Sequence, residues 1–141
     1  MSTRALIIRE TAVSVLINTV LSVLFFLLVF GMTNPVQLAA FGRDFLPQSF
    51  MIALMGTLVP SLILRKRTGA GTRSVILRAL AFVAGATAIG GGASFAVCAL
   101  LGGELDAMTG LAVKAAYGAA LAAIVTPLAL GAQFKASQET L

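Results

Sequence analysis

The chain has 141 residues, of which 59% are hydrophobic and 11% are charged, with ten Lys and Arg against five Asp and Glu. Soluble domains carry about 25% charged residues, so this chain cannot cover a water-facing surface and lipid is its expected solvent. It holds no His and one Cys, which excludes His-ligated haem, the common His-containing zinc sites, an intrachain disulfide and a CxxC redox pair. We therefore expect no enzyme activity, no cofactor and no metal.

Four apolar runs reach the roughly 17 to 25 residues that a membrane-spanning helix needs. They cover residues 11–31, 45–64, 75–101 and 110–130. The apolar core of the first run is longer than that of a signal peptide, so we interpret this run as a retained span. Only helices satisfy the backbone of an open chain inside hydrocarbon. The sequence therefore predicts an all-α fold, with one domain over residues 1–141 that forms a four-helix transmembrane bundle.

A polar face inside the membrane is predicted from hydroxyl and amide side chains in the first and third runs. Its members are Thr11, Ser14, Asn18, Ser22, Thr87 and Ser94. Hydrogen bonds between membrane helices are worth roughly 0.6 kcal/mol each, up to about 2. We interpret this face as structural, with substrate coordination along a polar pathway as the alternative. Glu10, beside Arg9, is interpreted as a hydrated or ion-paired residue at the membrane edge rather than a buried proton carrier.

Prolines stand in the second and fourth runs, at Pro60 and Pro127. Membrane helices tolerate proline where neighbouring groups satisfy the freed carbonyl, so a simple kink is the first interpretation. A matched pair of hinges for alternating access is the second interpretation.

The third run contains three consecutive glycines, each of which costs a helix in water about 1 kcal/mol relative to alanine. Between membrane helices, small residues four apart allow close approach. The residues predicted to make such contacts are Ala84, Ala88, Gly90, Gly91 and Gly92. We expect this helix to pack tightly against the alanine-rich fourth one. A discontinuous helix that opens a site at the membrane midplane is the alternative.

Lys114 stands about one turn inside the fourth run, where a lysine is expected to extend to the outer headgroups or to pair with Glu104 or Asp106. Aromatic residues gather in the outer half of the bundle and are interpreted as interfacial anchors and a docking surface rather than a cage for a cation. They are Phe25, Phe26, Phe30, Phe41, Phe45, Phe50 and Tyr117.

Four spans place eight of the ten basic residues on one side. The positive-inside rule then predicts that both termini and the connector between the second and third runs lie in the cytoplasm. The densest basic cluster consists of Arg65, Lys66, Arg67 and Arg73. It is expected to contact anionic lipid, at about 1 kcal/mol per basic residue. Because the basic residues lie between apolar runs and form no exposed stripe, no nucleic-acid partner is expected.

An internal match divides the chain into possible parallel two-helix repeats, residues 1–67 and 68–141. Arg9, Ala12 and Phe26 align with Arg78, Ala81 and Phe95, and "ALMGTLVP", which ends at Pro60, aligns with "ALAAIVTP", which ends at Pro127. Through Phe45, Pro60 and the basic triplet Arg65–Arg67, each repeat resembles a family of short two-span bacterial inner-membrane proteins of unassigned function. The resemblance covers the first half better than the second. It implies a bacterial inner membrane as the location, and it implies no activity.

Two function classes remain open. The first is a non-catalytic accessory, assembly or scaffold subunit, either homo-oligomeric or part of a larger membrane complex. The small-residue faces favour it, and so does the expectation that no charged residue is buried in the bundle. The second is a small oligomeric permease or channel for an ion or small solute, working through the polar face and the prolines. A membrane enzyme with Glu104 and Asp106 as a carboxylate pair ranks third, because two such residues in a short loop usually form a solvated turn.

Overall fold

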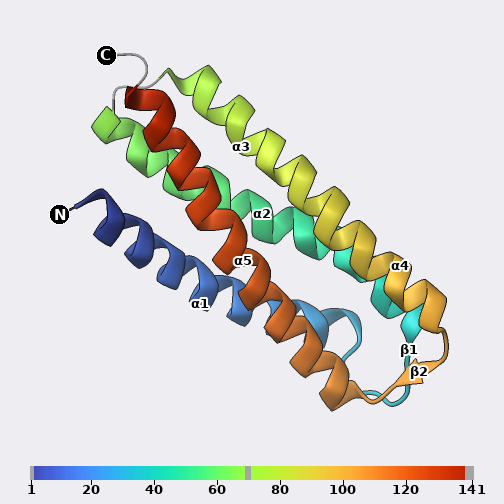
Figure 1. The fold of residues 1–141 in the computed structure, drawn as a ribbon. Coiled ribbons are helices and arrows are strands. Elements are labelled where there is room, and N and C mark those ends of the chain that lie inside the picture. The colour runs from blue at the N-terminus through green and yellow to red at the C-terminus, as the bar shows by residue number, and fades with distance from the viewer. Residues whose placement is uncertain (1, 69–70, 139–141) are drawn as a thin grey trace.

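The computed structural model describes residues 2–68 and 71–138, which form four long helical rods (Figure 1). The rods are α1 (Thr3–Val29), α2 (Leu38–Thr68), a third rod made of α3 (Thr72–Ala86), the π-helical turn η1 (Thr87–Gly91) and α4 (Gly92–Leu101), and α5 (Ala107–Gln138). Each rod is long and apolar enough to cross a membrane. The predicted all-α, four-helix class is therefore confirmed.

Every rod begins earlier than its apolar run predicts: α1 starts at Thr3 rather than at residue 11, and α2 starts at Leu38 rather than at residue 45. Arg43 and Asp44 lower the hydropathy of its first turns, yet both lie within the helix, and Asp44 is buried against the bundle. Pro60 lies inside α2 and Pro127 inside α5 without ending either helix. Their role as hinges stays a prediction.

A short two-stranded sheet joins the two loops at one end of the bundle. In it, β1 (Val36–Gln37) pairs antiparallel with β2 (Glu104–Leu105), and Val36 lies opposite Leu105. Gln37 Nε2 donates a hydrogen bond to Glu104 Oε1 at 2.5 Å. Two further bonds close the loops, from Leu38 N to Gly103 O at 3.0 Å and from Ala107 N to Asn34 Oδ1 at 2.6 Å. Glu104 is thus engaged across the sheet.

Asp106 caps the N-terminus of α5. Its Oδ2 accepts hydrogen bonds from Thr109 N at 2.8 Å and from Thr109 Oγ1 at 2.9 Å. These bonds, the backbone one first, lower the pKa of the Asp106 carboxyl. A lowered pKa in the folded state means that the cap stabilises the protein above the pKa of the unfolded chain, and that this stabilisation is lost as the pH falls through the folded value.

We expect Asp106→Ala to lower the melting temperature of the detergent-solubilised protein at pH 7, because α5 loses its cap. The difference from wild type should narrow as the pH falls below about 4, near the usual Asp pKa. Asp106→Asn is the control, since asparagine caps helices without titrating. A difference in melting temperature between wild type and Asp106→Ala that stays constant between pH 7 and pH 3 would contradict the role of the Asp106 carboxylate as the cap of α5.

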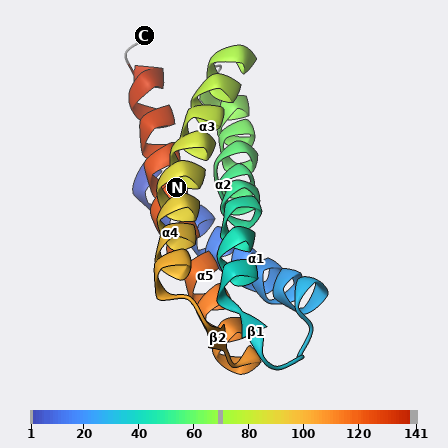
Figure 2. The same ribbon diagram turned by 90° about the vertical axis from the view of Figure 1, so that its right-hand side faces the viewer.

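α2 and α5 occupy the centre of the bundle. The third rod packs along α2, α1 packs along α5, and the two central helices pack on each other (Figures 1 and 2). By comparison α1 touches α2, and α3 touches α5, over short stretches. The prediction that the third helix packs tightly against the fourth is therefore wrong. Both helices are rich in small residues, but the third rod directs Val83, Gly91 and Cys98 inward, and Gly91 and Cys98 meet α2.

The glycine triplet lies at the π turn, and the rod continues through it. A Cβ on Gly91 would lie 3.0 Å from Ser49 Oγ and 3.1 Å from Phe45 O of α2, so glycine permits this close approach. In an ideal α-helix Gly91 would sit about 80° around the axis from Val83, eight residues earlier. The wider π turn reduces that offset and keeps both residues on the buried side.

The predicted packing residues of the third rod divide into two groups. Gly90 and Gly91 make close contacts, because a Cβ on Gly90 would lie 2.8 Å from the Tyr117 hydroxyl of α5. Ala84 and Ala88 are exposed, and nothing lies within 4 Å of a Cβ on Gly92. The prediction is wrong for these last three, since their line faces away from the bundle.

Equivalent features of the two halves recur at one spacing. α1 and α3 begin at Thr3 and Thr72, α2 and α5 begin at Leu38 and Ala107, and each pair is 69 positions apart. Val36 and Leu105, which face each other in the sheet, have the same separation. So do Thr57 and Thr126, both buried in the central helices. The Pro60–Pro127 match used to predict the repeat is displaced by two residues from this spacing.

Candidate functional site

A salt bridge between α5 and α2 lies inside the bundle. Lys114 Nζ is 2.8 Å from Asp44 Oδ2, and the two side chains are only 1% and 9% exposed. The prediction that Lys114 extends to the headgroups, or pairs with Glu104 or Asp106, is therefore wrong. Asp44 reaches Lys114 because α2 begins early: both residues stand about two turns from the end of the bundle that carries the sheet.

Two phenylalanine rings of α2 cover the ammonium group of Lys114. Nζ lies 3.7 Å from the centroid of the Phe45 ring and 4.9 Å from that of Phe41. Both distances are within the range of cation–π attraction. Phe26 packs edge-on against Phe41, with ring centroids 6.3 Å apart. The interpretation of the outer aromatic residues as anchors rather than a cage is thus wrong for Phe41 and Phe45, which enclose the protein's own cation.

Buried polar side chains continue from this ion pair toward the opposite end of the bundle. Gln48 Nε2 donates to Ser22 Oγ at 2.9 Å and to Lys114 O at 3.3 Å, which ties α2 to α1 and α5. Ser22 Oγ in turn donates to Asn18 O at 2.7 Å. These contacts extend the buried polar region by about one helical turn from the salt bridge, in the direction away from the sheet.

Further from the sheet, Asn18 Nδ2 donates to Ser14 O at 2.8 Å, and Thr126 Oγ1 donates to Ser14 Oγ at 2.8 Å. All of these side chains are buried. We refer to the whole set as the polar column: Ser14, Asn18, Ser22, Asp44, Gln48, Lys114 and Thr126.

The structure brings only some residues of the predicted polar face together. Ser14, Asn18 and Ser22 lie in the polar column, and the Thr11 hydroxyl next to them has no hydrogen-bond partner. Thr87 and Ser94 stand on the third rod, which packs along α2. Within residues 2–68 and 71–138 no hydrogen bond joins either of them to α1, so the face does not extend to that rod.

Asp44, Gln48 and Thr126 are column residues that the polar-face prediction missed, and the role of Lys114 was misassigned. A signal was present: Asp44 and Lys114 carry opposite charges and lie at similar distances from the two outer connectors. At the membrane edge, Arg9 Nη2 donates to Glu10 Oε1 at 2.6 Å, which is the local ion pair predicted for Glu10.

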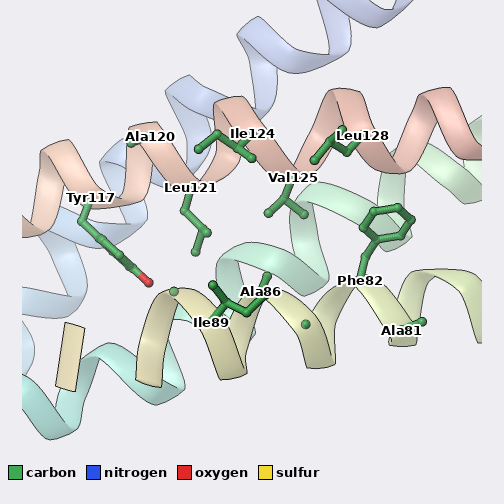
Figure 3. Close-up of a pocket in the computed structure, with 12 residues that line it drawn as sticks. Ala81, Phe82, Ala86, Ile89, Tyr117, Ala120, Leu121, Ile124, Val125 and Leu128 are labelled. Carbon is green, nitrogen blue, oxygen red and sulfur yellow. The ribbon is translucent and has the colours of Figure 1, made fainter. Parts of the chain in front are cut away.

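Two grooves open on the sides where the rods touch least. The α3–α5 groove has a volume of about 590 Å³ and an apolar lining, with Leu121 and Val125 facing Ala86 and Ile89 across it (Figure 3). Tyr117 stands at one end, and its hydroxyl is 2.5 Å from Ser49 Oγ. The α1–α2 groove is smaller, about 250 Å³, and the column residues Asn18, Ser22 and Gln48 contribute to its lining.

The end of α2 and the start of α3 lie at the end of the bundle opposite the sheet, as do the start of α1 and the end of α5 (Figure 1). Arg65, Lys66 and Arg73 are exposed there. The side chain of Arg67 lies outside the described part of the chain. Contact of this cluster with anionic lipid stays a prediction.

The fold and this interior are those of a multi-pass helical membrane protein, since four apolar rods surround a buried polar column. No protein-family model matches the chain, and neither a curated protein nor a solved structure matches it.

Proposed function

We propose that the protein is a small permease whose solute pathway follows the polar column. The observation that carries this proposal is the buried Lys114–Asp44 pair at the head of the column. Ionisable residues inside a membrane are costly, and a buried one is by default a candidate for an ion or solute pathway. The pair also removes a premise of the scaffold interpretation, which rested on the absence of buried charge.

The arrangement of the two halves supports the proposal. The common spacing of 69 positions is that expected of a tandem duplication with two parallel repeats. Transporters built from repeats bind their substrates near the midplane, where the repeats meet. The polar column lies at such a junction, because α1 and α2 belong to the first half and α5 to the second.

The two halves are unequal in a way that suits a single pathway. Ser14 and Ser22 of α1 correspond, at the common spacing, to Val83 and Gly91 of the third rod. The third rod therefore has no hydroxyl group at the two positions where α1 places one in the polar column.

We expect Asn18→Leu to reduce the flux of a small solute such as glycerol into proteoliposomes by about tenfold, given the roughly 1–2 kcal/mol that a membrane hydrogen bond can contribute. Osmotic swelling followed by light scattering measures this flux. Thr19→Val is the matched control, because Thr19 is the next residue of α1 and donates only to its own helix, at Val15 O. Swelling no faster than that of protein-free liposomes would reject the proposal.

A scaffold or assembly role is the second candidate, and one observation favours it. The α3–α5 groove is apolar, and Ala84 and Ala88 expose a line of small residues on the same rod. Native mass spectrometry after mild extraction reports the copy number and any retained subunit. A defined larger complex, together with absent solute flux, would support this role.

The location that goes with either role is a bacterial inner membrane, with the termini and the Arg65–Arg73 end in the cytoplasm. The support is the concentration of Arg and Lys at that end, as the positive-inside rule requires. The carboxylates Glu104 and Asp44 belong to the opposite half of the bundle.

A further inference from the structure

We infer that the α3–α5 groove binds an anionic phospholipid, with an acyl chain along the groove and the phosphate between Arg78 and Lys135. The groove has a volume of about 590 Å³, within the usual range of ligand pockets, and its lining is apolar. Tyr117 stands at one end, and Phe82 and Leu128 stand toward the other (Figure 3). The inference goes beyond the proposed function, since it concerns a bilayer component outside the polar column and requires no transport.

Arg78 and Lys135 continue the two helix faces that line the groove. Arg78 stands four residues before Phe82 and seven before Gly85, and Lys135 stands seven residues after Leu128. Residues three, four or seven positions apart share one face of a helix. Arg78 is partly exposed and Lys135 is exposed. The groove therefore leads to two basic side chains that a ligand can reach.

The two basic side chains converge at one level of the bundle. α3 begins and α5 ends at the same end, and Gln133 Nε2 lies 3.5 Å from Val75 O, so these two residues are level with each other. Arg78 lies three residues inward from Val75. Lys135 lies two residues outward from Gln133. Because Cβ atoms tilt toward the N-terminus of their own helix, Arg78 leans toward the end of the bundle and Lys135 leans back toward the groove.

The path from the apolar groove to this basic pair is open. Gly85 belongs to the lining of the groove, and Gly131 stands between Leu128 and Lys135 on the same face of α5. Nothing lies within 4 Å of a Cβ placed on either glycine. An acyl chain that occupies the groove can therefore continue without obstruction to a phosphate held at its basic end.

The charges at this end call for an anion. Within residues 2–68 and 71–138, no ion pair involves Arg78 or Lys135. Glu10, the acidic residue described at this end, is already bound by Arg9 at 2.6 Å. A second copy of the chain with the same membrane orientation would bring its own basic end to this level. A lipid phosphate supplies the missing negative charge, and basic side chains at the membrane surface attract anionic lipid.

The first half of the chain neutralises its equivalent of Arg78. At the common spacing Arg78 corresponds to Arg9, and Ala79 corresponds to Glu10. Arg9 donates to the carboxylate of Glu10, its neighbour in the chain. The second half has alanine at that position, so its arginine is left available for a ligand.

The first half also has larger side chains where the second half forms its groove. Four small residues that line the α3–α5 groove correspond to large apolar ones at the common spacing. Gly85, Ala86, Gly90 and Ala120 correspond to Leu16, Ile17, Leu21 and Met51. The α1–α2 groove is accordingly smaller, about 250 Å³ against about 590 Å³. Space for an acyl chain and an unpaired arginine therefore occur together in the second half.

The test compares phosphatidylglycerol with phosphatidylcholine of the same acyl chains, mixed equally in nanodiscs that hold the full chain. Native mass spectrometry measures which lipid the released protein retains. We expect phosphatidylglycerol to be retained about 25-fold over phosphatidylcholine, since each of the two basic residues contributes about a fivefold preference. In Arg78→Gln combined with Lys135→Gln the preference should fall to about one. Arg65→Gln combined with Lys66→Gln is the matched control, because it removes the same charge from the same end and should leave the preference intact.

A second pair of variants tests the groove without changing any charge. Gly85→Leu introduces the residue of the first half into open space, and it should abolish the retention of phosphatidylglycerol. Ala84→Leu, at the neighbouring exposed position, should leave it unchanged. Equal retention of the two lipids by the wild type would overturn the inference, as would equal losses in the two charge pairs or a lipid that survives in Gly85→Leu. A lipid-free dimer would assign the groove to a second copy and would overturn it as well.

Discussion

Lys114→Met is expected to lower the free energy of unfolding by about 3–5 kcal/mol, the usual cost of removing one partner of a buried ion pair. Methionine has a similar length, so the packing near Phe41 and Phe45 is largely kept. The loss arises because Asp44 is left charged and unpaired in the bundle. Reversible unfolding in mixed detergent micelles, followed by circular dichroism, measures it.

A double-mutant cycle separates the ion pair from other effects. Replacing a buried pair by apolar residues is often neutral, so Lys114→Met combined with Asp44→Leu should regain most of the lost stability. Gln48 Nε2 donates to the backbone oxygen of residue 114, so this contact is expected to persist in every variant. If the single variant loses less than about 1 kcal/mol, the pair is hydrated like a surface ion pair.

The same double variant tests the role of the pair in transport. Under the proposed function it should be stable but deficient in solute flux, because the charges at the head of the polar column are gone. A stable double variant with wild-type flux would limit the pair to holding α2 against α5.

The number of spans and part of the polar face could be predicted from the sequence, because hydropathy and helical spacing are local properties. The Lys114–Asp44 pair could not, since its partners are 70 positions apart and the default for a lysine near a helix end is to extend to the headgroups. The start of α2 could not be predicted either, because it also depends on the distant Lys114. A hydropathy window counts Asp44 as polar, whether or not a lysine of another helix neutralises it.

The face through which the third helix packs also could not be predicted from the sequence. Small residues cover more than one face of the third helix, and spacing alone did not separate Ala84, Ala88 and Gly92, which face outward, from Gly90 and Gly91. The π turn decides the matter by bringing Gly91 to the buried side. Such turns have no reliable signature in a single sequence.

The contact of α1 with α5 mirrors that of the third rod with α2. Ser22 packs on Gly118, and at the common spacing these positions correspond to Gly91 and Ser49, which pack on each other. Each contact thus pairs one serine with one glycine, but the serine lies on the peripheral helix in one half and on the central helix in the other. The combined volume of serine and glycine is therefore the same in both contacts, but the helix that carries the serine differs.

We therefore expect Gly118→Ala to lower the free energy of unfolding by about 1–3 kcal/mol, the cost of overpacking a close contact. A Cβ there would overlap Ser22 Oγ, and it would lie 3.0 Å from Ser22 Cβ and 3.1 Å from Asn18 O. The matched control is Gly131→Ala on the same helix, where nothing lies within 4 Å of the added carbon. This control should be neutral or gain up to about 1 kcal/mol, because alanine is the better helix former.

Exchanging the two residues gives the sharper result. Gly118→Ser alone should destabilise the bundle, whereas Gly118→Ser combined with Ser22→Gly should recover most of the loss by reproducing the Gly91–Ser49 arrangement. The recovery should be incomplete, because Gln48 Nε2 loses Ser22 Oγ as an acceptor. Unfolding in mixed micelles measures all four states. If Gly118→Ala proves as stable as Gly131→Ala, α1 does not pack on α5 at this position, and the polar column loses one of its walls.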